Sequence, residues 1–321
     1  MIFPQGKDFV FSIFDDTDVA TLEYIRPIYD ELSQLEIKTT KSVWPLSYSG
    51  KCDCSGSHTL EHKKYAEYIV HLKDRGFEIG LHGASMVSCQ RSEIEKAFDL
   101  FLKVVGHYPR TCSAHSTNRD NLYWGMDRFS FPLFKYLYQL LSGKSRDFYQ
   151  GHQKGSPYFW GDLAFKHLDY VRNFTYRDIN LLKISKFLPY TDKSKSFVKY
   201  WFFSCDADNV EEFNIVLQEK YQDQLAKEKG ICIISTHFGK GFVENGKLNE
   251  KTRKLLHSLS QKNGWFVPVS TVLDYLRTQQ TAISISKFGL FMLEYKWFKD
   301  FLIHGRKKKS YNKTEIPYLV Q

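Results

Sequence analysis

The sequence predicts an α/β fold in which parallel strands alternate with helices and close into a barrel. Short apolar runs recur along the 321-residue chain, and amphipathic segments with helical spacing separate them. Each of the clearest runs ends in polar residues, as expected where functional side chains lie at the carboxyl ends of parallel strands. We predict a barrel over residues 1–280, a long insertion at about 125–200, and an amphipathic, basic helical tail over 281–321.

The expected elements follow from periodicity. Short apolar or β-branched runs predict strands over residues 8–14, 77–81, 110–115, 202–205, 231–236 and 265–268. Apolar residues three and four positions apart predict helices over residues 20–35, 92–105, 131–141, 210–228, 249–263 and 270–277. Ser92 and Glu95 match the pattern of a capping box at the start of the second helix.

Composition indicates a folded protein, with 42% hydrophobic and 25% charged residues. The amino-terminal residues lack the features of a secretory signal, and no run approaches the roughly 18 apolar residues that span a bilayer. Six cysteines in so long a chain do not form a disulfide framework. We therefore expect a cytoplasmic location, at most at the inner face of the membrane.

Polar residues at the predicted strand ends are candidates for a metal site. Asp15 and Asp16 are adjacent carboxylates, whose repulsion a divalent cation would relieve. His82 and His115 are suitable metal ligands, and His237 is placed as a general acid. The alternatives are a helix amino-terminal cap for the acids and structural roles for the histidines.

The stretch from His115 to Trp124 combines hydrogen-bonding groups with aromatic residues, as sugar-binding sites do. We expect substrate contacts from Asn118, Arg119, Tyr123 and Trp124, with a capped helix start as the alternative. Asp206 follows another predicted strand and is a further candidate, although a helix cap nearby explains this segment equally well.

Three short motifs resemble the polysaccharide deacetylase family (NodB homology). They are residues 14–16 (Phe-Asp-Asp), 79–83 (Ile-Gly-Leu-His-Gly) and 236–237 (Thr-His). The resemblance implies a distorted (β/α) barrel that uses a divalent metal, in the first place zinc, to hydrolyse acetyl groups on glycans. It implies that Asp15 is the base, Asp16 and His82 are metal ligands, and His237 is the general acid.

The sequence departs from the family pattern at Met86, where a second metal-binding histidine is expected. A thioether is a poor ligand for a hard or borderline cation. His115 is our candidate for the third ligand, and His58 is the second choice. The arginine-bearing motif of the family is replaced by the stretch 115–124.

We expect removal of an N-acetyl group from a sugar or glycan precursor, in the setting of surface-polysaccharide biosynthesis. One alternative is a catalytically inactive carbohydrate-binding relative, which Met86 favours. Another is a glycoside hydrolase with two carboxylates, Asp15 and Asp206. Nucleic acid is not an expected partner, because the basic residues form no recognisable binding motif. The oligomeric state is not predicted.

Two further segments have open interpretations. Residues 283–309 combine an amphipathic helix with the basic run 306–309, which suits either contact with an anionic membrane surface or packing against the barrel. Cys52 and Cys54 with His58 form a candidate structural metal site, although their spacing is not that of a zinc finger.

Overall fold

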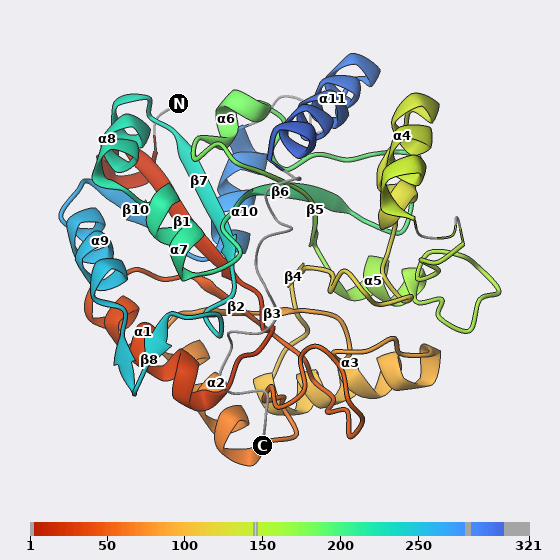
Figure 1. Cartoon of the computed structure of the whole chain (residues 1–321), viewed down its shortest axis with the longest axis horizontal. Helices are drawn as coiled ribbons and strands as arrows, with labels where there is room; N and C mark the ends of the chain where they lie inside the picture. Colours follow the sequence, from red (N-terminus) through yellow and green to blue (C-terminus); the bar gives the residue numbers. More distant parts are fainter. Residues whose placement is uncertain (1–2, 144, 146, 280–283, 305–321) are drawn as a thin grey trace.

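The computed structural model describes residues 3–143, 145, 147–279 and 284–304. A sheet of eight parallel strands closes into a barrel, with helices around it (Figure 1). The strands are β1 (Phe9–Asp15), β2 (Thr40–Val43), β3 (Glu78–Leu81), β4 (Thr111–Cys112), β5 (Tyr170–Tyr176), β6 (Tyr200–Asp206), β7 (Ile231–Thr236) and β10 (Gly264–Phe266). The predicted distorted (β/α) barrel is therefore confirmed.

The barrel closes through β1, which has three neighbours. β1 pairs with β7 from Val10 to Asp15, so the first and seventh strands meet. On the other edge of β1, β10 pairs with Phe9–Phe11, whereas β2 pairs with Phe14 and Asp15. This change of neighbour distorts the barrel and leaves the carboxyl end of β1 between β2 and β7.

Helices follow most of the strands, as the alternating sequence pattern indicates. They are α1 (Leu22–Gln34), α2 (Lys63–Asp74), α3 (Arg91–Val105), α4 (Pro132–Ser142), α5 (Gly161–His167), α6 (Leu181–Ile184), α7 (Val210–Val216), α8 (Glu219–Lys227), α9 (Glu250–Ser260), α10 (Val269–Gln279) and α11 (Lys287–His304). The 3-10 helices η1 (Pro4–Gly6) and η2 (Gly125–Arg128) and the hairpin strands β8 (Val243–Glu244) and β9 (Lys247–Leu248) complete the described elements. None of the described helices combines the length and the apolar character that crossing a bilayer requires.

Three details differ from the expectation. The capping box of α3 is formed by Gln90 and Glu93, not by the predicted Ser92 and Glu95. The helix predicted over 210–228 is divided into α7 and α8, because Gln218 has an extended backbone with a ψ of 144°. The predicted insertion contains β5, which is a barrel strand, so the long connection runs from β4 to β5.

Helix α11 packs on the barrel through aromatic side chains. Leu293 is fully buried, and the Phe129 ring lies 5.2 Å from Trp297 and 5.0 Å from Phe298. Such pairs add to the hydrophobic gain from burial. These contacts support the packing interpretation of this helix. The basic run 306–309 lies outside the described residues.

Candidate active site

Side chains alternate along a strand, so the two acids at the end of β1 point to opposite sides of the barrel wall. Asp15 is fully buried toward α1. Its Oδ2 accepts a hydrogen bond from the Tyr29 hydroxyl (3.0 Å) and lies 2.9 Å from Lys41 Nζ, and its Oδ1 accepts the Phe238 N–H (2.9 Å). Burial opposes charge on Lys41, but Asp15 raises its pKa above the usual value. Asp15 thus forms a buried ion pair with Lys41 on the α1 side of the barrel wall, and its predicted role as the base stays a prediction.

Asp16 faces the inside of the barrel mouth. Its Oδ1 accepts a hydrogen bond from Ser113 Oγ (2.6 Å) and lies 3.2 Å from His82 Nδ1. Its Oδ2 accepts one from Arg172 Nη2 (2.6 Å). Burial opposes ionisation, but Arg172 and His82 hold the pKa of Asp16 well below its usual value. Arg172 and His82 thus lie against the two oxygens of Asp16, and its predicted role as a metal ligand stays a prediction.

His82 connects the acids across the mouth. Its Nδ1 lies 2.5 Å from Ser113 Oγ, and its Nε2 lies 3.1 Å from Asp18 Oδ1. The Trp44 indole N–H donates to the His82 carbonyl (2.7 Å) and fixes its backbone. Burial opposes protonation, but Asp16 and Asp18 raise the pKa of His82 to about 9. His82 thus lies beside the aspartates as expected, but as a positively charged partner of them.

Asp18, which the sequence reading missed, is the centre of the cluster. Its Oδ2 lies 3.4 Å from His237 Nε2, 3.8 Å from Lys240 Nζ and 3.9 Å from His115 Nε2. Burial opposes its ionisation, but His237 and His82 hold the pKa of Asp18 well below its usual value. The sequence did contain a signal for Asp18, because it is the third acid of the run that begins with Asp15 at the end of β1.

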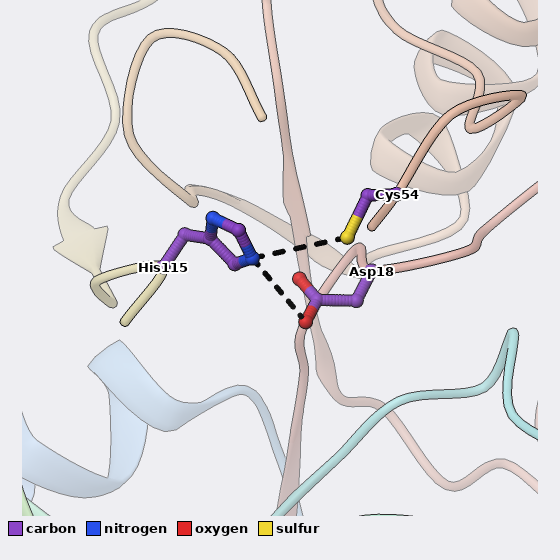
Figure 2. A group of neighbouring side chains, drawn as sticks. All are labelled: Asp18, Cys54 and His115. Atoms are coloured by element: carbon purple, nitrogen blue, oxygen red, sulfur yellow. Dashed lines mark hydrogen bonds and ion pairs between the residues drawn. The ribbon is translucent and has the colours of Figure 1, made fainter. Parts of the chain in front are cut away.

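One set of three side chains in the described part of the chain places metal-binding atoms within 4.8 Å of one another: Asp18, Cys54 and His115 (Figure 2). His115 Nε2 lies 3.8 Å from Cys54 Sγ and 3.9 Å from Asp18 Oδ2. Tetrahedral zinc bonds of about 2.0–2.3 Å place such ligand pairs roughly 3.3–3.6 Å apart, so the three groups would have to move closer to bind one ion. Of the predicted metal ligands Asp16, His82 and His115, only His115 belongs to this set, and metal binding by the other two stays a prediction.

His115 is oriented by its neighbours. Its Nδ1 lies 3.1 Å from Asn118 Oδ1 and 3.0 Å from Thr117 Oγ1. The Asn118 amide donates to the carbonyls of Ser85 (3.0 Å) and Val87 (2.9 Å). Burial lowers the pKa of His115, so the imidazole is neutral near pH 7, as a metal ligand must be. Asn118, predicted to contact substrate, is thus a positioning residue for His115.

His237 directly follows β7 and contacts Asp18. Its Nδ1 lies 2.8 Å from the Asp208 carbonyl oxygen and 3.2 Å from Asp208 Oδ1, which places a proton on Nδ1. Its Nε2 faces Asp18 Oδ2. Burial opposes protonation, but Asp18 raises the pKa of His237. This shift favours the protonated form, which a general acid requires.

Two predicted substrate contacts instead pack the connection between β4 and β5. Tyr123 is 8% exposed, and its ring lies 4.3 Å from the His152 ring. The Arg128 guanidinium lies 3.9 Å from the Trp124 ring. Both aromatic residues are held by protein groups, and neither belongs to the cluster around Asp18.

A cavity of about 300 Å³ opens beside His115. Its lining residues are Cys52, Asp53, Met86, Val87, Ser88, His115, Thr117 and Asn118. This mixture of polar and apolar groups suits a sugar. Arg119 and Asp206 are not among the lining residues: Arg119 is exposed, and Asp206 ends β6 in register with Ser235. Their contact with substrate stays a prediction.

No protein-family model matches the chain, and no curated protein matches it significantly. A structure from Mycobacterium smegmatis described as a polysaccharide deacetylase aligns with a TM-score of 0.52 and 11% identity, over 89% of this chain and 96% of that one. Weaker alignments include the allantoinase Puue (TM-score 0.48, 11% identity, 87% and 93% covered) and a polysaccharide deacetylase from Pseudomonas aeruginosa PAO1 (TM-score 0.49, 12% identity, 87% and 94% covered). The chain therefore has the polysaccharide-deacetylase fold.

Proposed function

We propose that the protein is a metal-dependent hydrolase of the deacetylase type, which removes an acetyl group, in the first place N-acetyl, from a sugar or glycan precursor. The observation that carries the proposal is the convergence of Asp18, Cys54 and His115 at the mouth of a barrel of this fold, beside His237. Surface-polysaccharide biosynthesis is the setting that the family resemblance suggests.

The ligand set fits a divalent cation. Carboxylate, thiolate and imidazole groups are the ligands that Zn²⁺ takes in proteins, and their atoms lie within 4.8 Å of one another in Asp18, Cys54 and His115. A bound cation supplies Lewis acidity to the acyl carbonyl and lowers the pKa of water. The neighbouring Lys240 and His237 balance the charge of Asp18.

The remaining polar side chains at the mouth move protons. His237 donates a proton from Nε2 to the departing amine or alcohol, because its Nδ1 is held by the Asp208 carbonyl. Asp16 is ionised and lies at the mouth, so we assign it the proton of the attacking water, although Arg172 and His82 lower its basicity. This assignment replaces Asp15 as the base.

The cavity beside His115 holds the sugar. Met86 and Val87 offer an apolar surface for a ring face, and Asp53, Ser88 and Thr117 offer hydrogen-bonding groups for hydroxyls. Met86, which stands where the family pattern has a second histidine ligand, is 3% exposed, packs with Cys54 and lines this cavity.

The test is acetate release from a panel of N-acetylated and O-acetylated sugars, with and without a chelator. We expect release that the chelator abolishes and zinc restores. Asp18→Asn should lose this activity, whereas the matched control Asp99→Asn, on the exposed face of α3, should retain it. A metal-free protein that binds sugars but releases no acetate would support the inactive-relative alternative instead.

We also propose that α4 and α11 contact an anionic membrane surface. These neighbouring helices expose Leu133, Tyr136, Leu140 and Leu141 on α4 and Phe288, Phe301, Leu302 and Ile303 on α11. The basic run 306–309 follows α11 in the sequence, and a basic segment that adjoins an apolar one in sequence favours anionic lipid. The protein should sediment with vesicles that contain phosphatidylserine and not with neutral vesicles, and Leu140→Ser with Phe301→Ser should weaken this binding. Absence of binding to either vesicle would refute the proposal.

A further inference from the structure

The loop between β2 and α2 is tied to the segment that leads from β1 to α1. The His58 N–H donates to the Ala20 carbonyl (2.8 Å), and His58 Nδ1 accepts the Leu22 N–H (3.0 Å). Within the loop, the Cys54 carbonyl accepts hydrogen bonds from Ser57 Oγ (2.7 Å) and the Ser57 N–H (3.1 Å). His58, considered from the sequence as a metal ligand, therefore anchors the loop that carries Cys54.

The residue after Asp18 is held in an uncommon conformation. Val19 has a φ of 57°, which is costly for a β-branched side chain. A Cβ atom at Gly239 would lie 2.5 Å from the Val19 carbonyl carbon, so close backbone packing maintains this turn. The turn therefore fixes the backbone next to Asp18. Burial and the Asp18 carboxylate raise the pKa of the Cys54 thiol above its usual value, so the free thiol keeps its proton until a cation displaces it.

We propose that Cys54 binds the cation as a thiolate, together with Asp18 and His115, and makes the site selective for zinc over hard cations such as Mg²⁺. This inference rests on the proposed cation site and specifies its ligands. Cys54 is 5% exposed, and its Sγ lies 3.8 Å from His115 Nε2. When the metal–sulfur bond forms, the thiol proton leaves to solvent, and the resulting thiolate is a soft ligand.

The neighbours of Cys54 connect it to the barrel mouth. Cys54 packs with Trp44 and Met86 in a small cluster apart from the main core. The Trp44 ring lies 5.5 Å from both the His82 and the His115 rings, so this cluster adjoins the histidines of the mouth. A buried thiol that only filled space would not need to face an imidazole nitrogen and a carboxylate.

Cys52 provides a matched control two residues away. It is half-buried and lines the cavity, and its Sγ lies 3.7 Å from Ser55 Oγ. It does not belong to the set that Asp18 and His115 form with Cys54. Cys52→Ser removes a thiol from the same loop without removing a proposed ligand.

The test is the absorption spectrum of the protein loaded with Co²⁺ in place of zinc. The wild type and Cys52→Ser should show a thiolate-to-cobalt charge-transfer band in the near ultraviolet, with the intense visible bands of tetrahedral cobalt. Cys54→Ser should lose the charge-transfer band and bind zinc at least about tenfold more weakly in a competition titration, since even loss of an outer-shell partner costs that much. Persistence of the band in Cys54→Ser would overturn the proposal.

X-ray absorption at the zinc edge of the wild type gives a second result that requires no variant. We expect one sulfur neighbour at about 2.3 Å beside nitrogen and oxygen neighbours, and a shell of nitrogen and oxygen alone would overturn the proposal. Chelator-sensitive acetate release without a sulfur neighbour would leave the proposed function standing. A sulfur neighbour without acetate release from any sugar would support Cys54 as a ligand and refute the proposed deacetylase function.

Discussion

Replacement of Asp15 by Asn tests whether this acid serves the fold or the chemistry. Asp15 and Lys41 are both fully buried and lie 2.9 Å apart, so the substitution leaves Lys41 as a buried charge without its counterion. Breaking a buried ion pair by removing one partner costs about 3–5 kcal/mol. In a protein of this size, that cost lowers the thermal midpoint by roughly 4–7 °C.

The assay is thermal unfolding followed by circular dichroism, with the companion variants Lys41→Met and the double variant of Asp15→Asn with Lys41→Met. The double variant should lose less stability than the two single variants together, by about 2 kcal/mol or more, because it removes both charges. Zinc stoichiometry should stay unchanged in Asp15→Asn, because Asp15 faces α1 and not the mouth. An unchanged thermal midpoint together with loss of acetate release would refute this reasoning and return Asp15 to the role of base.

Three further variants probe the mouth and α11. His237→Gln should lower acetate release by roughly 10²–10⁴-fold in a steady-state assay while calorimetry still shows one bound zinc; unchanged turnover would exclude His237 as the acid. Gly239→Ala should weaken zinc binding in calorimetric titration, because its Cβ would lie 2.5 Å from the Val19 carbonyl carbon and displace the turn that carries Asp18; equal affinity would contradict this. Glu294 accepts hydrogen bonds from the N–H groups of Ser130 and Phe131, and burial raises its pKa from the usual 4.5 to about 7. Its folded form thus retains a proton that the unfolded chain loses, so its stabilisation declines as pH rises from about 4.5 through 7. Glu294→Gln should therefore gain thermal stability relative to the wild type between pH 5 and pH 8, and parallel melting curves at both pH values would contradict this.

The sequence predicted the strands that are apolar, but not the strands β2 and β5, which carry a buried charge. β1, β3 and β7 stand out in the sequence because their runs are short and apolar. β2 includes Lys41 and β5 includes Arg172. The burial of these cations depends on ion pairs with Asp15 and Asp16, at the end of β1. Those acids come from a distant part of the chain, so the sequence pattern of β2 and β5 alone does not reveal a strand.

The convergence of the strand-end histidines was predictable, but the candidate set of Asp18, Cys54 and His115 was not. The rule that functional residues follow parallel strands correctly brought His82, His115 and His237 to one mouth. It did not distinguish Asp15 from Asp16, because β1 is buried along its whole length and shows no alternation of polar and apolar residues. Cys54 was inaccessible to the same rule, because it lies on a loop whose position depends on hydrogen bonds to another segment.

The most direct test of the proposed centre is a crystal structure of the zinc-loaded protein, with anomalous differences measured at the zinc edge. We expect one strong peak within about 2.0–2.3 Å of Asp18, Cys54 and His115 side-chain atoms. A peak between Asp16 and His82, or none at the barrel mouth under saturating zinc, would contradict the proposed metal centre.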